Sequence, residues 1–472
     1  MGGPKEKKRY SVIIVGAGPA GMACAYQLYK LGIQDVLIIE ASKHVGGLSR
    51  SIDFNGSQVD IGPHRFLTHH REVFQFFKEV LGNDLLTIQR KTRIHFKGNF
   101  IEYPLALGNI VKILGIGTGI KILKSFIAGR FKKYSNNFEG ALKSRFGDYL
   151  FDLFFKDYTE KLWGLPVSEI DASWAEQRIQ GFSLTKAIAG IFLKRKEATV
   201  SDVFYYPRFG AGFFYKKLQK LLMEQKVDFQ LNRRIEKLYP KDKGSIFELT
   251  DNQGDVYLAD HMVSTMPLNH LLAALPAIDQ AVIEKAERLQ FRSTVFVYVQ
   301  LDKTNLSDDH WIYLQMPDVR SGRLTNFNNW SADQLADTSK THLCLEYWTN
   351  EDDALFNQDS GSFEAMAQAD LKRLGLMNSA QIVSCKVLKV AKTYPIYYNG
   401  YQEDLKALQQ QLNGIENLYP IGRYGSYKYN NQDHSLLMGM LAAQKIAGDN
   451  IDLWGIDYNT YIEKGNIHES VP

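Results

Sequence analysis

Three glycines and one carboxylate have the spacing of a site that binds a dinucleotide. The glycines are Gly16, Gly18 and Gly21, and the carboxylate is that of Glu40. Gly16 suits a tight turn, Gly18 lets the backbone approach a pyrophosphate, and Gly21 allows a helix to pack closely on a strand. Glu40 lies where an acid accepts hydrogen bonds from an adenosine ribose, and its charge disfavours a 2′-phosphate. The pattern therefore predicts a dinucleotide site that NADP fits poorly.

The elements that must position these residues follow the same order along the chain. Residues 10–15 have the continuous apolar pattern of a buried strand, residues 22–31 have a helical pattern, and residues 36–40 form a second apolar strand. Together they make one βαβ unit, in which the helix N-terminus supplies N–H donors and a positive dipole end to a phosphate. Agreement among these elements favours a Rossmann-type fold over an accidental glycine turn.

A second glycine pair lies just beyond the acid, in the segment HVGGLSR. Gly46 and Gly47 are followed by Ser49 and Arg50, so backbone amides, a hydroxyl and a guanidinium form a second surface for a pyrophosphate and a ribitol chain. We therefore expect FAD rather than NAD. The chain has one nucleotide fingerprint, so NAD(P)H is expected at most as a transient reductant without a Rossmann domain of its own.

A C-terminal segment is expected to return to the flavin. Residues 417–443 predict a short strand, the pair Gly422-Arg423, a polar aromatic loop, and a helix from about Ser435 to Ile446. Asp433 can accept a hydrogen bond from a ribitol hydroxyl or cap the helix, and the two roles are compatible. Amides at the start of the helix can face the pyrimidine end of the flavin, where negative charge gathers on reduction.

These segments carry a resemblance to a known family. The segment Gly46 to Ser49 resembles the FAD-contacting Gly-Gly-x-Ser/Thr segment of the amine-oxidase and protoporphyrinogen-oxidase superfamily. The run from Gly422 to Ser435 resembles the C-terminal signature of eukaryotic-type UDP-galactopyranose mutases. Pro63 replaces a glycine that is usual in that family and removes one N–H beside His64. Further matches occur in the same order along nearly the whole chain: Asp60 to His64, Arg93-Ile94, Phe100 to Pro104, Leu162 to Pro166, Ala175 to Arg178, Val263 to Met266, Trp311 to Tyr313, Arg323, and Asn326 to Asn328.

The resemblance implies which residues would bind each ligand, and it names His64, Arg178 and Arg323 as catalytic. Arginines can make planar bidentate contacts with a diphosphate, and tyrosine hydroxyls can donate to it. The residues implied to bind FAD are Gly16, Gly18, Pro19, Ala20, Gly21, Glu40, Ala41, Gly46, Gly47, Leu48, Ser49, Gly62, Pro63, His64, Gly422, Arg423, Asn431, Gln432, Asp433 and Ser435. Those implied to bind the substrate are Trp163, Arg178, Tyr313, Arg323, Asn326, Tyr394 and Tyr429.

The same resemblance implies an activity. It indicates a FAD-dependent enzyme that acts on a nucleotide sugar, and it favours a UDP-galactopyranose mutase-like isomerase of ring forms in which N5 of the reduced flavin is the nucleophile. His64 would lie near N5, with a purely structural histidine as the alternative. Two other functions stay open: a FAD-dependent oxidoreductase of the amine oxidase or protoporphyrinogen oxidase type, and a flavin-binding assembly protein without turnover. The sugar, the nucleotide base, the physiological reductant and the oligomeric state also stay open.

The elements between these motifs predict three interleaved units. Residues 105–196 are mainly helical in pattern, whereas residues 227–267 and 293–349 contain strand patterns separated by turn residues. We expect an α/β fold with three domains. These are a discontinuous Rossmann-type FAD-binding domain (1–104, 205–290 and 415–472), a mainly helical domain (105–204) and an antiparallel β-sheet substrate domain (291–414).

Composition argues against several other classes of protein. The 472 residues carry a net charge of +4, which gives no sign of a nucleic-acid partner. Three widely separated cysteines argue against a disulfide scaffold and a structural zinc site, and they fit a reducing cytosol. No apolar segment precedes the first strand, so we expect no secretory signal and a cytoplasmic protein.

One apolar segment has a mixed character. Residues 110–131 include Lys112, Lys121, Lys124 and Arg130, so they lack the roughly 20 uninterrupted apolar residues of a spanning helix. We expect an amphipathic surface helix of a soluble domain. Contact with a membrane surface is the alternative, because the lysines lie among isoleucine, leucine and phenylalanine.

Overall fold

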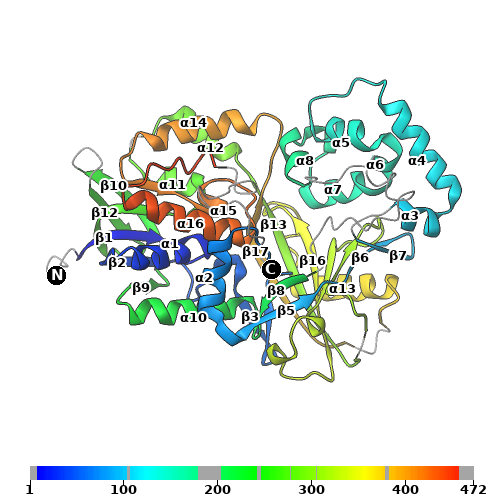
Figure 1. Ribbon diagram of the computed structural model, residues 1–472, viewed down its shortest axis with the longest axis horizontal. Coiled ribbons are helices and arrows are strands. Elements are labelled where there is room, and N and C mark those ends of the chain that lie inside the picture. The colour runs from blue at the N-terminus through cyan, green and yellow to red at the C-terminus, as the bar shows by residue number, and fades with distance from the viewer. Residues whose placement is uncertain are drawn as a thin grey trace.

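Two large β-sheets and a separate group of helices make up the chain, as the computed structural model shows (Figure 1). The structure describes residues 8–103, 107–178, 203–241, 246–276, 278–304, 306–377 and 382–456. Each large sheet has seven strands, and the helices α3 to α8 form one end of the molecule (Figure 1).

The βαβ unit lies in the middle of the first sheet. β1 (Lys8–Val15) pairs in parallel with β2 (Val36–Glu40) on one side and with β12 (Val256–Ser264) on the other. The register places Val15 beside the ends of both neighbours, so three carboxyl ends meet at the edge where open α/β sheets bind ligands. The other strands of this sheet are β9 (Asp228–Leu231), β10 (Ile235–Lys241), β11 (Ile246–Asp251) and β18 (Leu418–Pro420).

Two helices that are far apart in the sequence pack together on this sheet (Figure 1). α1 (Pro19–Lys30) follows the glycine turn, and α16 (Gln432–Ile446) crosses it closely. A Cβ on Gly439 would lie 2.1 Å from the carbonyl oxygen of Ala20, so only glycine fits at this crossing. The crossing holds a late segment of the chain against the first βαβ unit.

The second sheet has the order β17-β13-β16-β15-β14-β6-β7 and is antiparallel except between β14 and β6. Every residue of β13 (Phe291–Leu301) is buried, because both faces of the strand are covered. Val295 packs in the core that includes α13 (Ser360–Arg373), and Phe296 packs in the core that includes Tyr206. Alternate side chains therefore belong to two different cores. The other strands are β6 (Thr92–Phe96), β7 (Asn99–Glu102), β14 (Trp311–Leu314), β15 (Arg323–Asn326), β16 (Thr341–Thr349) and β17 (Ile382–Pro395).

The helical group replaces the single surface helix expected over residues 110–131 by two helices, because Gly115 with φ 87° separates α3 from α4. Within the described ranges, no helix is both long enough and apolar enough to cross a membrane. The helices of this group are α3 (Leu107–Leu114), α4 (Ile116–Gly129), α5 (Phe138–Phe146), α6 (Asp148–Phe154), α7 (Lys156–Trp163) and α8 (Ala172–Arg178).

Shorter elements connect these parts of the chain. The connecting strands are β3 (Ser51–Phe54), β4 (Ser57–Asp60), β5 (Leu85–Gln89) and β8 (Val203–Pro207). The connecting helices are α2 (Arg71–Leu81), α10 (Ala211–Glu224), α11 (Leu268–Ala274), α12 (Gln280–Arg288), α14 (Tyr401–Asn413) and α15 (Gly422–Gly425).

The predicted α/β fold is confirmed, with three differences in detail. Within the strand patterns expected over residues 227–267, residues 256–264 form one continuous strand, β12. The C-terminal helix begins at Gln432 instead of near Ser435. The hairpin β6–β7 pairs in the second sheet, although the predicted boundary places residues 1–104 in the FAD-binding domain. Its partner strand β14 is distant in sequence, so no local pattern indicates this pairing.

Candidate functional site

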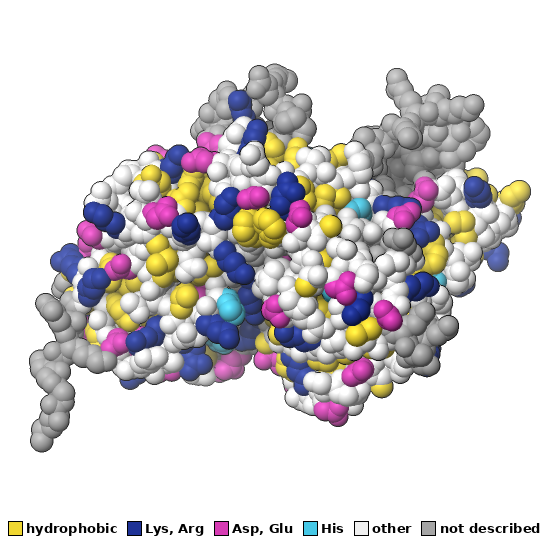
Figure 2. Space-filling view, turned by 90° about the horizontal axis from the view of Figure 1, so that it is seen from below, with side chains coloured by type: hydrophobic (Ala, Val, Ile, Leu, Met, Phe, Trp, Pro, Cys, Tyr) yellow, Lys and Arg dark blue, Asp and Glu magenta, His cyan; other side chains and the backbone are white. Residues whose placement is uncertain are grey.

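A cavity of about 890 Å³ is lined by segments from three distant parts of the chain. These segments are the carboxyl ends of β1 and β2, the face of the second sheet that carries Phe296 and Trp311, and residues 422–435. In the space-filling view, a hollow bordered by basic and histidine side chains lies near the middle of one face (Figure 2). Within the described ranges, no group of His, Cys, Asp and Glu side chains could hold a metal ion.

One wall of the cavity is made of main chain. Gly16 has φ 106°, and a Cβ on it would lie 1.9 Å from the Thr265 hydroxyl oxygen. A Cβ on Gly47 would lie 3.2 Å from the Cα of Gly18, so the two glycine segments lie against each other. Pro19 begins α1, and no side chain caps this helix. The amides of the first helical turn are therefore left to a ligand phosphate.

The carboxylate of Glu40 is fixed at the end of β2. The amide of Ala17 donates to Oε2 at 2.7 Å, and the amide of Ser42 donates to Oε1 at 2.8 Å. Each oxygen keeps a lone pair that can accept from a ribose hydroxyl. The two hydrogen bonds therefore fix the orientation of the Glu40 carboxylate and leave it able to accept further hydrogen bonds.

A second helix N-terminus lines the same cavity. α16 begins at Gln432 after Asn431, whose side chain makes no capping hydrogen bond. Asp433 is the second residue of the helix, so the alternative that it caps the helix is wrong. Its buried side chain lies in the first turn, where a negative charge is stabilised by the helix dipole. Two helix ends therefore direct positive dipole ends at one site.

His64 lies on the loop after β4 and lines the cavity. Its Nε2 donates to the carbonyl oxygen of Ile61 at 2.9 Å. Burial, together with the positive charges of Arg423 and Arg323, lowers the pKa of His64 to about 4. The imidazole is therefore neutral at pH 7, and its Nδ1 can accept a hydrogen bond.

The opposite wall is made of side chains on one face of the second sheet. The register places Tyr313 beside Arg323, and Arg323 beside Glu346. On the next strand, Phe296 lies beside Glu346. Residues opposite each other on neighbouring strands point to the same face. Tyr313, Arg323 and Phe296 line the cavity, whereas Glu346 is fully buried between them.

Arg323 forms an ion pair within this wall. Its Nε and Nη2 each donate to one carboxylate oxygen of Glu346 at 2.6 Å, and Nη2 lies 3.4 Å from the Tyr394 hydroxyl. Burial lowers the pKa of Arg323, but the Glu346 carboxylate more than offsets this effect, so the pKa is raised. The bidentate edge expected to bind a phosphate is thus occupied by Glu346, and Nη1 is the nitrogen left for a ligand.

Two tyrosines extend the side-chain wall. Tyr394 and Tyr429 stack with ring centroids 5.5 Å apart, and the guanidinium of Arg423 lies 5.4 and 5.3 Å from these two rings. Burial raises the pKa of Tyr394 to about 12, so its hydroxyl stays protonated and can donate. Trp163 is buried behind the pair, with its ring centroid 6.4 Å from Tyr394 and 6.3 Å from Tyr429. Trp163 therefore supports the wall but does not line the cavity.

Two predicted substrate residues remain, Asn326 and Arg178. Asn326 is three residues after Arg323 in β15, so strand alternation directs its side chain to the other face of the sheet. There it donates to the carbonyl oxygen of Ser307 at 3.1 Å and accepts from the amide of Asn328 at 3.2 Å. Arg178 is the last residue of α8, and its side chain lies outside the described residues.

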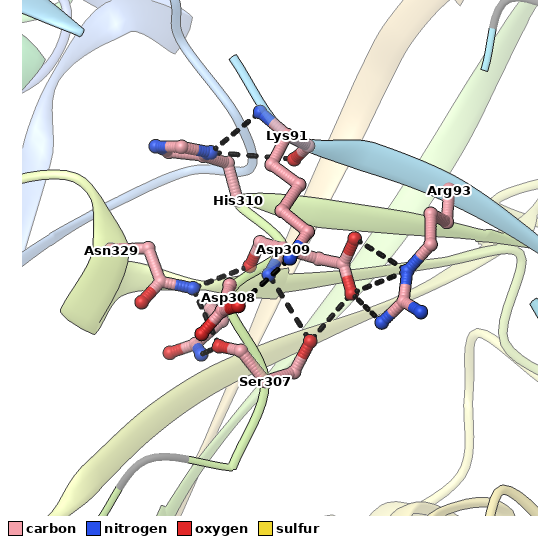
Figure 3. Close-up of polar contacts among 8 residues, drawn as sticks. Lys91, Arg93, Ser307, Asp308, Asp309, His310 and Asn329 are labelled. Atoms are coloured by element: carbon pink, nitrogen blue, oxygen red, sulfur yellow. Dashed lines mark hydrogen bonds and ion pairs between the residues drawn. The ribbon is translucent and has the colours of Figure 1, made fainter. Parts of the chain in front are cut away.

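A polar network fixes the start of β14 (Figure 3). Arg93 of β6 makes a two-point ion pair with the fully buried carboxylate of Asp309, at 2.9 and 2.5 Å. The side-chain nitrogen of Asn329 donates to the carbonyl oxygens of Ser307 and Asp309, each at 2.7 Å. These contacts lie just before Trp311, which lines the cavity. Arg93 therefore acts in the framework of the wall.

The structure brings most of the residues implied to bind FAD to the cavity, and the three that do not line it are Gly21, Gly46 and Gly62. A Cβ on Gly21 would lie 2.0 Å from the carbonyl oxygen of Gly16, so Gly21 supports the glycine turn from behind. The lining residues from that set are Gly16, Gly18, Pro19, Ala20, Glu40, Ala41, Gly47, Leu48, Ser49, Pro63, His64, Gly422, Arg423, Asn431, Gln432, Asp433 and Ser435.

Arg65 is a cavity residue that the sequence reasoning missed. Its guanidinium lies 5.6 Å from the Trp311 ring, and its buried Nη1 has no hydrogen-bond partner among the residues that the structure describes. A buried guanidinium nitrogen without a partner is costly, so it indicates a polar ligand atom in the cavity. The one feature of the sequence that could have indicated Arg65 as a cavity residue is its position directly after His64. Besides Arg65, Arg323 and Arg423, the arginines that line the cavity are Arg50, Arg233 and Arg234.

Comparisons with known sequences agree with this geometry. The family model described as "Flavin containing amine oxidoreductase" matches residues 19–447. A UDP-galactopyranose mutase of Mycoplasma genitalium is 22% identical over 455 residues, which are 93% of this chain and 95% of that protein. A probable UDP-galactopyranose mutase of Klebsiella pneumoniae is 28% identical over 171 residues, which are 34% of this chain and 43% of that protein. The chain spans less than half of the length of the first curated relatives it matches.

Solved structures show the same fold. A crystal structure of reduced UDP-galactopyranose mutase matches with a TM-score of 0.82 and 24% identity, covering 93% of this chain and 96% of that one. A putrescine oxidase bound to putrescine matches with a TM-score of 0.63 and 16% identity, covering 94% of this chain and 100% of that one. The resemblance to UDP-galactopyranose mutases within the amine oxidase superfamily is thereby confirmed.

Proposed function

The chain belongs to the family of flavin-containing amine oxidoreductases, and we propose that it is a UDP-galactopyranose mutase-like isomerase that interconverts the ring forms of a nucleotide sugar. The observation that carries this proposal is a single cavity with two unlike walls. The main-chain wall suits the pyrophosphate of FAD, because helix amides face it. The wall of arginines and tyrosines suits the diphosphate of a nucleotide sugar.

The main-chain wall has room for FAD where side chains would otherwise stand. Gly16, Gly18 and Gly47 leave a cradle that Cβ atoms would fill, and this cradle fits a pyrophosphate. Glu40 would accept from the adenosine ribose, and the start of α16 would face the flavin. When bound in its reduced form, the flavin supplies a nucleophile at N5 for covalent catalysis.

Residues of the side-chain wall would hold the substrate in place. The hydroxyls of Tyr394 and Tyr429 and the free Nη1 of Arg323 would donate to the diphosphate, and their positive surroundings would stabilise it as a leaving group. Arg65 would supply a further donor beside Trp311. His64 is held neutral, so its Nε2–H would keep donating to the carbonyl oxygen of Ile61, and its Nδ1 would accept a hydrogen bond from the ligand. The side chains of this wall would thus align the substrate and stabilise the leaving diphosphate, while the cofactor would supply the nucleophile.

A FAD-dependent oxidoreductase is the second candidate, and the family match itself favours it. A 1-hydroxycarotenoid 3,4-desaturase of a Flavobacterium is 36% identical over 102 residues, which are 21% of this chain and 20% of that protein. An oxidase of uncharged or cationic substrates has no need of arginines around the substrate space. The cations and tyrosines of the second wall therefore favour the isomerase.

An assay of the reduced enzyme tests the proposal. Protein reduced with dithionite is incubated with a panel of UDP- and dTDP-sugars, and pyranose and furanose products are separated. We expect interconversion by the reduced protein and none by the oxidised protein. Oxygen consumption with amine substrates, together with no isomerisation after reduction, would establish the oxidoreductase instead. Binding of FAD without binding of any sugar nucleotide in either redox state would indicate a protein without turnover.

A further inference from the structure

Helix α4 carries a stripe of large apolar side chains that the described chain leaves exposed. Its members are Ile116, Ile120, Leu123 and Ile127, which are 73%, 50%, 45% and 53% exposed, and their spacing of four, three and four residues places them on one face of the helix. Phe131, two residues after the end of the helix, extends the stripe and is 87% exposed. A run of this kind on a water-soluble surface is unusual, because exposed apolar residues normally occur singly.

The other apolar face of α4 explains why the stripe points outward. Ile122 and Phe126 are buried, and α4 packs on α5 and α6. A Cβ on Gly147, between α5 and α6, would lie 2.8 Å from the amide nitrogen of Phe126, so the backbones are in close contact. This contact sets the rotation of α4 about its own axis, and the stripe is held on a different side from the packed face.

The chain segment that carries the stripe has only positive charges. Residues 103–138 contain no aspartate or glutamate. Their positive charge exceeds the net +4 of the whole chain, so the remainder of the chain is net negative. The cations of this segment are Lys112, Lys121, Lys124, Arg130, Lys132 and Lys133.

The positions of these cations match those of an interfacial helix. At 100° per residue, Lys124 flanks one side of the stripe and Arg130 flanks the other, with Lys121 farther round. Arg130 lies 4.9 Å from the Phe126 ring, and Lys132 forms an ion pair with Asp148 at 2.5 Å. In the space-filling view, apolar and basic side chains lie together at the end of the molecule formed by these helices (Figure 2).

We propose that α4 docks this protein on the surface of an anionic lipid bilayer, with the apolar stripe among the acyl chains and the flanking cations on the lipid phosphates. The helix has 14 residues, a length of about 21 Å, which is shorter than the roughly 30 Å of a bilayer core, so it lies in the interface. A second copy of the chain fits this face poorly, because two such faces would oppose like charges. The inference is independent of the reaction in the cavity.

Vesicle flotation with the full-length flavoprotein tests the proposal. Vesicles of phosphatidylglycerol and phosphatidylcholine in equal amounts are compared with vesicles of phosphatidylcholine alone. We expect binding to the anionic vesicles, weakened by salt, and at least tenfold weaker binding to the neutral ones. The variant Ile120→Ser/Ile127→Ser is expected to reduce binding to anionic vesicles at least tenfold.

Two matched variants keep the test decisive. Met223→Ser/Val383→Ser removes apolar side chains that are 56% and 49% exposed elsewhere on the surface, and it is expected to bind vesicles as the wild type does. Lys121→Gln/Lys124→Gln leaves the apolar stripe intact and is expected to lose roughly tenfold in affinity and part of the salt dependence. Flavin content shows that each variant is folded.

Three outcomes would overturn the proposal. Wild-type protein that floats with neither kind of vesicle is one, and equal losses in the stripe and Met223/Val383 variants are another. The third is a wild-type protein that is oligomeric and does not bind vesicles, together with a stripe variant that is monomeric. This result would assign the face to contact between protein chains. The Lys121/Lys124 variant decides the question if the stripe variant fails to fold.

Discussion

The two walls of the cavity would bind ligands by different means. In the main-chain wall, the donors are amides, and the space comes from glycines at positions 16, 18 and 47. In the side-chain wall, the donors are guanidinium and hydroxyl groups of Arg323, Tyr394 and Tyr429, held by an ion pair and by ring stacking. Added side-chain volume should therefore damage the first wall, whereas loss of charge or of a hydroxyl should damage the second. Each wall can be altered with the other left intact.

The largest effect on FAD binding is expected from Gly16→Val. Its Cβ would overlap Thr265 at a φ of 106°, so FAD affinity should fall about a hundredfold or more, or ~3 kcal/mol. Flavin absorbance per chain and equilibrium dialysis measure this loss. Gly448→Val is the control, because Gly448 has a φ of 112° and a Cβ on it would meet no atom within 4 Å. A Gly16→Val protein that keeps its flavin would contradict the proposal that the main-chain wall binds FAD.

Arg323→Ala should have the largest effect on nucleotide-sugar binding. It leaves the buried Glu346 carboxylate without its partner, which costs about 3–5 kcal/mol of unfolding free energy, and it should abolish nucleotide-sugar binding. FAD content per folded chain should not change. Arg323→Met/Glu346→Leu should regain most of the stability without regaining sugar binding, as measured by urea unfolding and calorimetry.

The exposed ion pair between Arg9 and Asp260 provides a control for Arg323. Arg9→Ala should cost at most about 1 kcal/mol, because the two side chains are 59% and 36% exposed. Loss of flavin in both Arg323 variants would show that the two walls are not independent.

His64 should make stability depend on pH. The imidazole of the unfolded chain takes up a proton below about pH 6.5, whereas the folded-state pKa is about 4. Stability should therefore fall as the pH is lowered from 6.5 to 4, by about 2–3 kcal/mol in the flavin-free protein. Urea unfolding of the wild type and of His64→Gln at pH 7 and 4.5 measures the difference. His69→Gln, at an exposed histidine, should follow the wild type, and an identical pH response of His64→Gln would contradict the assignment.

Tyr429→Phe should have the smallest effect. Loss of one hydroxyl donor should weaken nucleotide-sugar binding about three- to tenfold, or ~1 kcal/mol, with FAD affinity unchanged. Isothermal titration with a UDP-sugar measures the change, and Tyr29→Phe on the surface is the control. Unchanged sugar affinity would remove this hydroxyl from the proposed diphosphate site.

The main-chain wall could largely be predicted from the sequence, because its first parts are neighbours along the chain. The strand, glycine turn, helix and second strand form as expected between Lys8 and Glu40. The C-terminal helix also forms, although its first turn begins at Gln432. Local spacing is enough for such features, since each depends on a few consecutive residues. The FAD-binding roles themselves stay predictions.

The side-chain wall could be predicted only in part. The family resemblance points to Tyr313 and Arg323, whereas it points to neither Glu346 nor Arg65. The cross-strand pair of Arg323 and Glu346 depends on the register of two strands, and no local spacing encodes that register. Asn326 is close to Arg323 in sequence and was expected at the substrate, but strand alternation directs its side chain to the opposite face.

The close crossing of α16 over α1 has a consequence for biosynthesis. Gly439 can meet Ala20 only after nearly all of the described chain has left the ribosome, so the nascent N-terminal unit has half of its cofactor cradle and an uncovered apolar helix face. Flavin loading is therefore expected to be a late, post-translational event. A chain that stops before Gln432 should be recovered without flavin and should depend on chaperones, which pull-down of stalled nascent chains can measure.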